Sequence, residues 1–425
     1  MTLSAACHVG GSDAGDLGTF SLSHKEQVEQ PSTSKAPTVP SVQRADAGAA
    51  TIPANDPIAP GAADAGTSAS DAAVSDAAVS DAAASDAAIS DVDASQPNPP
   101  AKSSWTMLGY DLGSTFNNSA ETILSKQTAS QLRRRFTMEV GHAVYGAPLL
   151  VDDKLFYVDQ EWVHALNITD GTLLWEALLG ETNADQIATN TMVYDDGKLY
   201  IHLRNAEVMV LDAENGKMVW HSSADARYDR GYGSPTVADN LVLVGRSPSE
   251  DQALGAGRFR GSLIAHDKID GSIRWRTDTV DENQRGAGIW SAPTVSLDLG
   301  LVYVATGPSP STPEPAAANG FMAVELATGI LRFSIQLGLA SDPAAHGSTG
   351  FEFGASPIVF ELENQGTKRT LMAAGTRTGS VHVLDANSGE YIWLGELGPG
   401  SSDGDTGILA NGAWSGKYLL FALNR

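Results

Sequence analysis

Cysteine is almost absent from this sequence, which has a single one, Cys7, among 425 residues. One cysteine excludes a disulfide within the chain and any zinc or haem site that needs several cysteines. No run of 18 apolar residues occurs, so no segment is typical of a membrane-spanning helix. Positive charge is also scarce, because 27 Lys and Arg stand against 51 Asp and Glu for a net charge of −24. Such a charge repels a phosphate backbone, and we therefore expect no nucleic-acid partner.

Aromatic residues are nearly missing from the first 103 residues, where Phe20 is the exception. This region consists mainly of Ala, Ser, Asp, Gly, Pro and Thr, and the phrase Ser-Asp-Ala-Ala-x recurs every five residues over 70–88. Such a composition buries too little apolar surface to offset the loss of chain entropy on folding. We therefore expect residues 1–103 to form a disordered tether and residues 104–425 to hold the folded part.

The sequence around Cys7 offers two interpretations. Residues Ser4 to Cys7 resemble the processing site of a bacterial lipoprotein, which predicts lipid attachment at Cys7 and a periplasmic or outer-surface location. Ser4 stands where such sites usually have leucine, and the hydrophobic stretch of a signal peptide is missing. The other interpretation is an isolated thiol in a disordered tail.

Residues 105–425 contain one phrase five times. Each copy reads apolar-x-apolar-apolar, an acidic or amide residue, three residues, glycine, three residues, and an aromatic residue. The copies cover 163–175, 208–220, 263–275, 321–333 and 381–393. Their glycines are separated by 45, 55, 58 and 60 residues, and periods of this size indicate a propeller or a solenoid.

Each copy makes physical sense as a β-hairpin. The glycines supply the positive φ that the turn needs, and the acidic or amide side chain four residues earlier accepts backbone N–H groups of the turn. The aromatic residue then falls on the next strand, where we interpret it as a wedge between neighbouring sheets rather than as a ligand contact. The pairs are Asn167 and Gly171, Asp212 and Gly216, Asp267 and Gly271, Glu325 and Gly329, and Asp385 and Gly389.

An earlier pair of strands precedes every copy, which gives four strands per repeat. A sixth repeat begins at Ile408, and the sequence ends at Arg425 before its glycine phrase. We predict an all-β propeller from about residue 137, with five complete sheets and a partial sixth in an incomplete ring. Residues 105–132 should lie against this ring. An open strand edge near Phe421 is expected to pair with another chain or another protein partner.

Several segments of residues 105–425 resemble pyrroloquinoline-quinone (PQQ) propellers, most closely those of the polyvinyl-alcohol-dehydrogenase type. The segments are 105–117 (WTMLGYDLGSTFN), 259–265 (FRGSLIA), 286–307 (GAGIWSAPTVSLDLGLVYVATG), 353–357 (FGASP) and 375–385 (GTRTGSVHVLD). The resemblance implies a quinone and a calcium ion in a central funnel, where an alcohol is oxidised to a carbonyl. No haem motif is present, so an active enzyme would need an external electron acceptor.

Two residues match the quinone-binding positions of this family. Trp290 matches the tryptophan on which the quinone stacks, and Arg377 matches the Arg or Lys that contacts the quinone. The alternative is structural in both cases: Trp290 as one more packing aromatic, and Arg377 as a solvated hairpin arginine.

The metal and catalytic positions of the family are changed in this chain. Glu250 or Asp251 matches an acidic metal ligand, although a surface charge pair is the alternative. Pro308 and Ser309 stand where the family has an asparagine ligand, so Ser309 offers the remaining oxygen. Gly350 occupies the position of the catalytic aspartate, and Glu352 is a substitute displaced by two residues.

These changes leave two functions open. One is a binding or scaffold propeller that presents loops to a protein partner, similar to the lipoprotein scaffold of outer-membrane protein assembly. The other is a diverged PQQ-dependent alcohol dehydrogenase with an alcohol substrate. Losing both a metal ligand and the catalytic acid removes the base that takes the alcohol proton, which favours the first. We therefore expect no tight binding of PQQ and calcium and no measurable alcohol oxidation.

Overall fold

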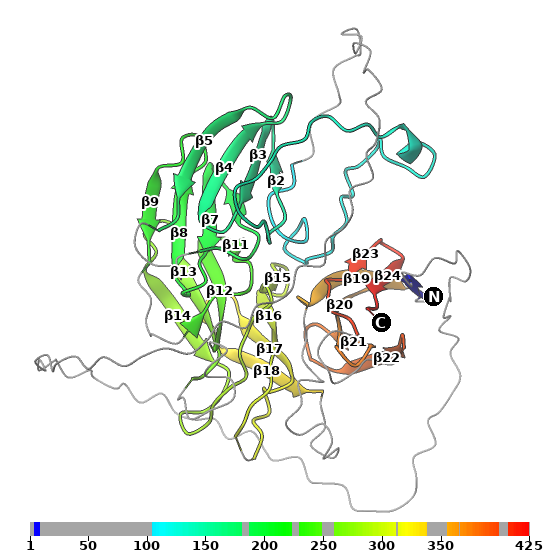
Figure 1. Cartoon of the computed structure of the whole chain (residues 1–425). Coiled ribbons are helices and arrows are strands. Elements are labelled where there is room, and N and C mark those ends of the chain that lie inside the picture. The colour runs from blue at the N-terminus through cyan, green and yellow to red at the C-terminus, as the bar shows by residue number, and fades with distance from the viewer. Residues whose placement is uncertain are drawn as a thin grey trace, which may run out of the picture. The chain divides into compact units, whose positions relative to one another are not determined.

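A computed structural model describes residues 4–8, 104–180, 187–222, 229–248, 259–311, 313–337, 355–364, 366–398 and 407–424 (Figure 1). Within these ranges the chain is built from β-strands and one short 3-10 helix, η1 (Ala129–Gln131). No helix in the described part is long and apolar enough to cross a membrane.

The described strands from β2 to β24 form six sheets that follow one another in sequence and whose pairs are antiparallel. The first two contain β2 (Leu149–Val151), β3 (Lys154–Val158), β4 (Trp162–Asn167) and β5 (Leu173–Leu178), and β6 (Val193–Asp195), β7 (Lys198–His202), β8 (Val208–Asp212) and β9 (Met218–His221). The third contains β11 (Thr236–Ala238), β12 (Leu241–Pro248), β13 (Ser262–Asp267) and β14 (Ile273–Asp278), and β10 (Asp229–Arg230) pairs with the end of β12. The fourth and fifth contain β15 (Thr294–Ser296), β16 (Leu301–Thr306), β17 (Gly320–Glu325) and β18 (Leu331–Gln336), and β19 (Ile358–Asn364), β20 (Thr367–Gly375), β21 (Ser380–Asp385) and β22 (Tyr391–Glu396). The sixth contains β23 (Ala413–Trp414) and β24 (Tyr418–Ala422).

This order confirms the repeat unit of four strands that the sequence predicts. In each of the first five sheets the first strand of the repeat pairs with the second, the second with the third and the third with the fourth. Short first strands of neighbouring sheets are in contact, as in β2 with β6 and β15 with β19. Buried apolar clusters fill the seams between successive sheets. The architecture is a PQQ-type propeller whose sheets do not close into a complete ring.

The turn between the third and fourth strands follows the predicted chemistry. All five turn glycines have a φ between +70° and +76°. Asn167, Asp212, Asp267 and Asp385 each accept a backbone N–H from two residues further along the turn. Glu325 differs, because its longer side chain accepts a bond from the Thr328 hydroxyl at 2.8 Å instead.

The aromatic residues of the first four repeats lie over the turn glycine of the next sheet. A Cβ placed on Gly216, Gly271 or Gly329 would fall within 2.6 Å of a ring carbon of Trp175, Trp220 or Trp275, respectively. The three indole N–H groups donate to backbone carbonyls of the same neighbouring sheets, at 3.0–3.2 Å. The structural interpretation of these aromatics is therefore confirmed. Phe136 covers Gly171 in the same way, although it lies outside the repeats.

We expect Gly271→Ala to destabilise the protein by about 2 kcal/mol more than Gly197→Ala. The two glycines have nearly the same φ, +76° and +75°, so an alanine at either position carries the same left-handed backbone strain. They differ in surroundings, because a Cβ at Gly271 meets Trp220 and a Cβ at Gly197 meets nothing within 4 Å. Urea unfolding of the two variants measures the difference, and equal losses would remove the close-packed wedge as the reason for this glycine.

A segment before the repeats, which we name the strap (residues 105–116), holds the first strands of five sheets. Trp105 exchanges two backbone bonds with Leu150, and Tyr194 donates to the Thr106 carbonyl. Further along the strap, the carbonyls of Leu112, Gly113 and Thr115 accept N–H groups of the first strands of the fourth, fifth and sixth sheets. The prediction that this segment lies against the ring is confirmed for 105–116. A strap with so many partners fixes the sheets relative to one another.

One strand lies in the region predicted to be disordered. Strand β1 (Ser4–His8) pairs in parallel with β24, with Cys7 opposite Phe421. Since β24 also pairs with β23, both of its edges are occupied, and the prediction of an open edge near Phe421 is wrong. The physical reason is that an extended segment of the chain itself satisfies the backbone groups of this edge. The rest of the predicted tether, residues 1–3 and 9–103, lies outside the described residues.

Candidate functional site

The two ends of the first strand in each sheet lie at opposite ends of the propeller repeat. By the family resemblance, the cofactor of the family belongs at only one of these ends. Strands β15 and β16 pair with Ser296 opposite Leu301 and Thr294 opposite Tyr303. The hairpin 297–300 therefore lies at one end, and Trp290, which precedes β15, lies at the other together with Gly307, which follows β16. We name these the hairpin end and the Trp290 end.

Backbone bonds from two sheets hold the segment that presents Trp290. Ile289 donates to the carbonyl of Arg246 on β12, and Gly307 donates to the carbonyl of Gly288. The indole ring is half-buried and lies against Gly307, where a Cβ would come within 2.9 Å of the ring. A side chain at position 307 would therefore displace the ring. A fixed aromatic face that stays partly exposed is suited to stacking on a planar ring.

Arg377 follows β20 in the fifth sheet and belongs to a tight turn. Thr376 and Gly379 close this turn with backbone bonds of 2.9 and 3.0 Å to Ser380 and Thr376. The backbone at Gly407 passes so close to this turn that a Cβ on Gly407 would overlap the Arg377 carbonyl. Arg377 is half-buried, and its quinone-binding role stays a prediction.

Ser309 follows Gly307 by two residues, and its hydroxyl is bonded within this region. The hydroxyl donates to the carbonyl of Arg285 and accepts the N–H of Ser311 at 3.1 Å. The carbonyl of Pro308 likewise accepts the N–H of Ala287. The described residues include no group of three or more His, Cys, Asp or Glu that could hold a metal. At the asparagine position of the family, Pro308 has no side-chain oxygen, and the Ser309 hydroxyl already makes two hydrogen bonds.

The structure does not describe the side chains of the remaining predicted site residues. Glu250, Asp251 and Glu352 lie outside the described residues, as does Gly350. Cys7 is described only through its backbone, as part of β1. Their suggested roles in metal binding, catalysis and lipid attachment stay predictions.

Sequence reasoning missed a buried polar cluster between the second and third sheets. His202, Arg246, Ser262 and His266 are each at most 1 % exposed. Their strands β7, β12 and β13 otherwise contribute Tyr200, valines and Ile264 to this seam. The available signal was Arg246 itself, a charged residue that directly follows the apolar run 241–245. We name this cluster the 2–3 seam.

Burial and charge act in the same direction on the two histidines of the 2–3 seam. The Nδ1–H of His202 donates to the Gly233 carbonyl at 2.8 Å, and its Nε2 has no hydrogen-bond partner among the described residues. Burial, aided by the charge of Arg246, lowers the pKa of His202 to about 4. Burial first and Arg246 second also lower the pKa of His266. Both rings are therefore neutral at pH 7.

Comparison with known proteins agrees with this architecture. The model of the PQQ_2 family, described as "Outer membrane protein assembly factor BamB", matches residues 75–250 and 159–359. A polyvinylalcohol dehydrogenase of Pseudomonas sp. is 28% identical over 61% of this chain and 46% of its own length. The chain thus spans about half the length of the curated relatives it matches.

Two solved structures share the fold at low sequence identity. The quinohemoprotein alcohol dehydrogenase ADHIIG of Pseudomonas putida HK5 superposes with a TM-score of 0.57 at 20% identity, covering 70% of this chain and 48% of that one. A europium-containing methanol dehydrogenase also gives a TM-score of 0.57, at 18% identity, and covers 69% of this chain and 58% of that one. The matched repeats, the succession of four-stranded sheets and the wedges between them show that the chain belongs to the PQQ_2 family of β-propellers.

Proposed function

We propose that this chain is an extracytoplasmic propeller that binds a partner through its loops and does not oxidise alcohols. The observation that carries the proposal is the poor supply of metal-ligand oxygens at residues 308 and 309. Pro308 has no side-chain oxygen, and the Ser309 hydroxyl is held by Arg285 and Ser311. These two bonds leave the Ser309 oxygen one lone pair, and a neutral hydroxyl is a weaker calcium ligand than the carboxamide oxygen of the family. The sequence change at Gly350, where the family has its catalytic aspartate, supports the same conclusion.

The family description favours a scaffold role for the loops. The matching model is named for an outer membrane protein assembly factor, which is a protein that acts through partners. A binding propeller needs neither the metal nor the acid that this sequence has lost.

A PQQ-dependent alcohol dehydrogenase is the second candidate function. Trp290 and Arg377 favour it, because the first presents a half-buried indole face and the second a cation at the family's quinone positions. A bound quinone would supply the redox chemistry, while Trp290 would orient the ring and Arg377 would stabilise negative charge on it. The relatives named as polyvinylalcohol dehydrogenases give this candidate its substrate class.

Titration with PQQ, with and without calcium, separates the two candidates. We expect PQQ to quench tryptophan fluorescence weakly, with the same affinity for PQQ with and without calcium. In Trp290→Ala the quenching should fall at least tenfold. Stacking on Trp290 needs no metal, whereas the family's catalytic site does. Trp393→Ala in the fifth sheet is a control that removes one fluorophore away from the Trp290 end. A calcium-dependent gain of tenfold or more in affinity would favour the dehydrogenase.

Lipid attachment at Cys7 is the proposed means of anchoring at the periplasmic or outer cell surface. The supporting pattern is the short run of small residues before Cys7. Processing before Cys7 would remove Ser4 to Ala6 and thus more than half of the β1 pairing with β24. Metabolic labelling with a fatty acid should mark the wild-type protein and not Cys7→Ser, and equal labelling of both would exclude this anchor.

A further inference from the structure

A cavity at the hairpin end lies outside the site already described. Its volume is about 590 Å³, and we name it the strap pocket because strap residues 107–115 form one of its walls. The other walls come from β15, the hairpin after it, β19 and β23. Ser296 at its edge ends β15, whereas Trp290 precedes the other end of this strand. A ligand in the strap pocket therefore does not compete with one at Trp290.

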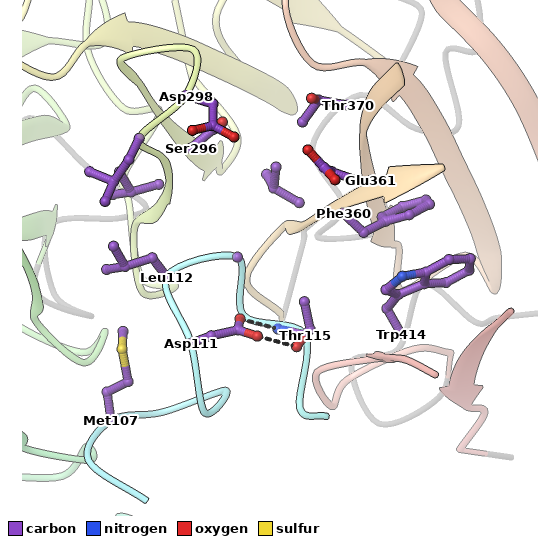
Figure 2. A pocket seen from close by; sticks show the side chains of 14 residues that line it. Met107, Asp111, Leu112, Thr115, Ser296, Asp298, Phe360, Glu361, Thr370 and Trp414 are labelled. Atoms are coloured by element: carbon purple, nitrogen blue, oxygen red, sulfur yellow. Dashed lines mark hydrogen bonds between the residues drawn. The ribbon is translucent and has the colours of Figure 1, made fainter. Parts of the chain in front are cut away.

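Backbone bonds hold the walls of the strap pocket in place. Val295, Val359 and Trp414 each donate an N–H to a strap carbonyl at 2.8 Å, so three sheets are joined around the cavity. Asp111 fixes the strap itself, because its two carboxylate oxygens accept the backbone N–H and the hydroxyl of Thr115 (Figure 2). These two bonds fix the Asp111 side chain, so Asp111 shapes the wall of the pocket. A pre-formed pocket of this size is typical of small-ligand and short-peptide sites.

The lining combines apolar side chains with two carboxylates besides that of Asp111. Leu112 and Phe360 line the cavity, and Phe360 packs on Trp414 with ring centroids 4.4 Å apart. Asp298 and Glu361 belong to different sheets, and Figure 2 shows both at the part of the pocket near Thr370. Both carboxylates are exposed. Glu361 pairs with Lys368 at 3.2 Å, and because Lys368 is also exposed, a ligand cation can easily displace it. The lining residues include no lysine or arginine.

We propose that the strap pocket binds a short peptide segment that carries Lys or Arg next to apolar side chains. The cation pairs with Asp298 and Glu361, and the apolar side chain packs against Leu112 and Phe360. Charge complementarity selects this occupant, because an anionic ligand would meet two carboxylates on a chain with a net charge of −24. The site is independent of the quinone question, since no lining residue belongs to the Trp290 end.

The test uses the full-length protein and a fluorescently labelled hexapeptide of alternating leucine and lysine. Anisotropy should show saturable binding, and a hexapeptide of alternating leucine and glutamate should not bind. The double variant Asp298→Asn, Glu361→Gln should weaken binding at least tenfold. The control Asp152→Asn, Asp170→Asn removes the same charge from exposed turns of the first sheet at the same end, and it should change binding less than twofold.

Three results would overturn the proposal. The first is binding that is not saturable or does not distinguish the two peptides. The second is an equal loss in the control variant, which would mean diffuse attraction to an acidic surface. The third is dimerisation of the protein that disappears in Asp298→Asn, Glu361→Gln, because a second copy would then occupy the pocket.

Discussion

Trp220→Ala is expected to lower the free energy of unfolding by about 4 kcal/mol, because it removes a large aromatic side chain from a seam between sheets. Trp220 is 9 % exposed and lies between the second and third sheets, over Gly271. Its indole N–H donates to the Lys268 carbonyl at 3.1 Å, so the substitution also leaves a carbonyl without its donor. Urea unfolding measures the loss.

Trp393→Ala is the matched comparison for this prediction. Trp393 holds the same place in the fifth repeat but is only half-buried. We expect about half the loss, because less apolar area returns to water. If both substitutions cost the same, packing over the next sheet's glycine would not be the source of the stabilisation by these aromatics.

Acidification from pH 7 to pH 4 is expected to reduce stability by about 3 kcal/mol through His202 alone. Burial depresses the pKa of this histidine from 6.5 in the unfolded chain to about 4 in the folded protein. Below pH 6.5 the unfolded state therefore binds a proton that the folded state does not. The stabilisation is complete above pH 6.5 and is lost as the pH falls toward 4. His266 adds to the loss in the same direction.

His202→Asn tests the origin of this acid sensitivity. Asparagine keeps a donor for the Gly233 carbonyl, which His202 Nδ1 contacts at 2.8 Å, and it does not titrate. Between pH 7 and pH 4, the free energy of unfolding of the variant should fall by about 3 kcal/mol less than that of the wild type. His382, whose pKa burial also lowers to about 4, belongs to a different sheet and should keep its own contribution. An unchanged pH dependence in His202→Asn would show that the 2–3 seam does not govern acid unfolding.

The regular part of the fold could be predicted from the sequence because its signals are local and repeated. A turn glycine with its acidic partner specifies a hairpin over a few residues, and five copies specify the sheet order. The aromatic wedges followed from their fixed place in that phrase. Glu325 shows the limit of such local reasoning, since its extra methylene group moves its bond from the backbone to Thr328.

The parts that could not be predicted depend on contacts distant in sequence. Strap residues bond to strands spread over most of the folded part, from Leu150 to Trp414, and no local pattern encodes those partners. Pairing of β1 with β24 joins the two ends of the sequence in the same way. The 2–3 seam arises because Arg246 faces strands of two sheets, which only the assembled propeller brings together.

The candidate site was predicted as a set of positions, and the structure adds what each one contacts. The Trp290 ring lies against Gly307, and the segment that presents it is bonded to Arg246 of the neighbouring sheet. Ser309 was expected as a weak metal ligand, whereas its hydroxyl is bonded within the loop. That bond could not be predicted from the sequence, because it depends on how the chain near Arg285 folds against residues 308–311.

Dye-linked oxidation of a secondary alcohol by the full-length protein, supplied with PQQ and calcium, tests the central claim most directly. We predict no rate above that of the same mixture without protein, because Pro308 and Ser309 do not provide the metal ligand and Gly350 cannot take the alcohol proton. A rate that requires both PQQ and calcium and is lost in Glu352→Ala would contradict the claim and make this propeller a dehydrogenase.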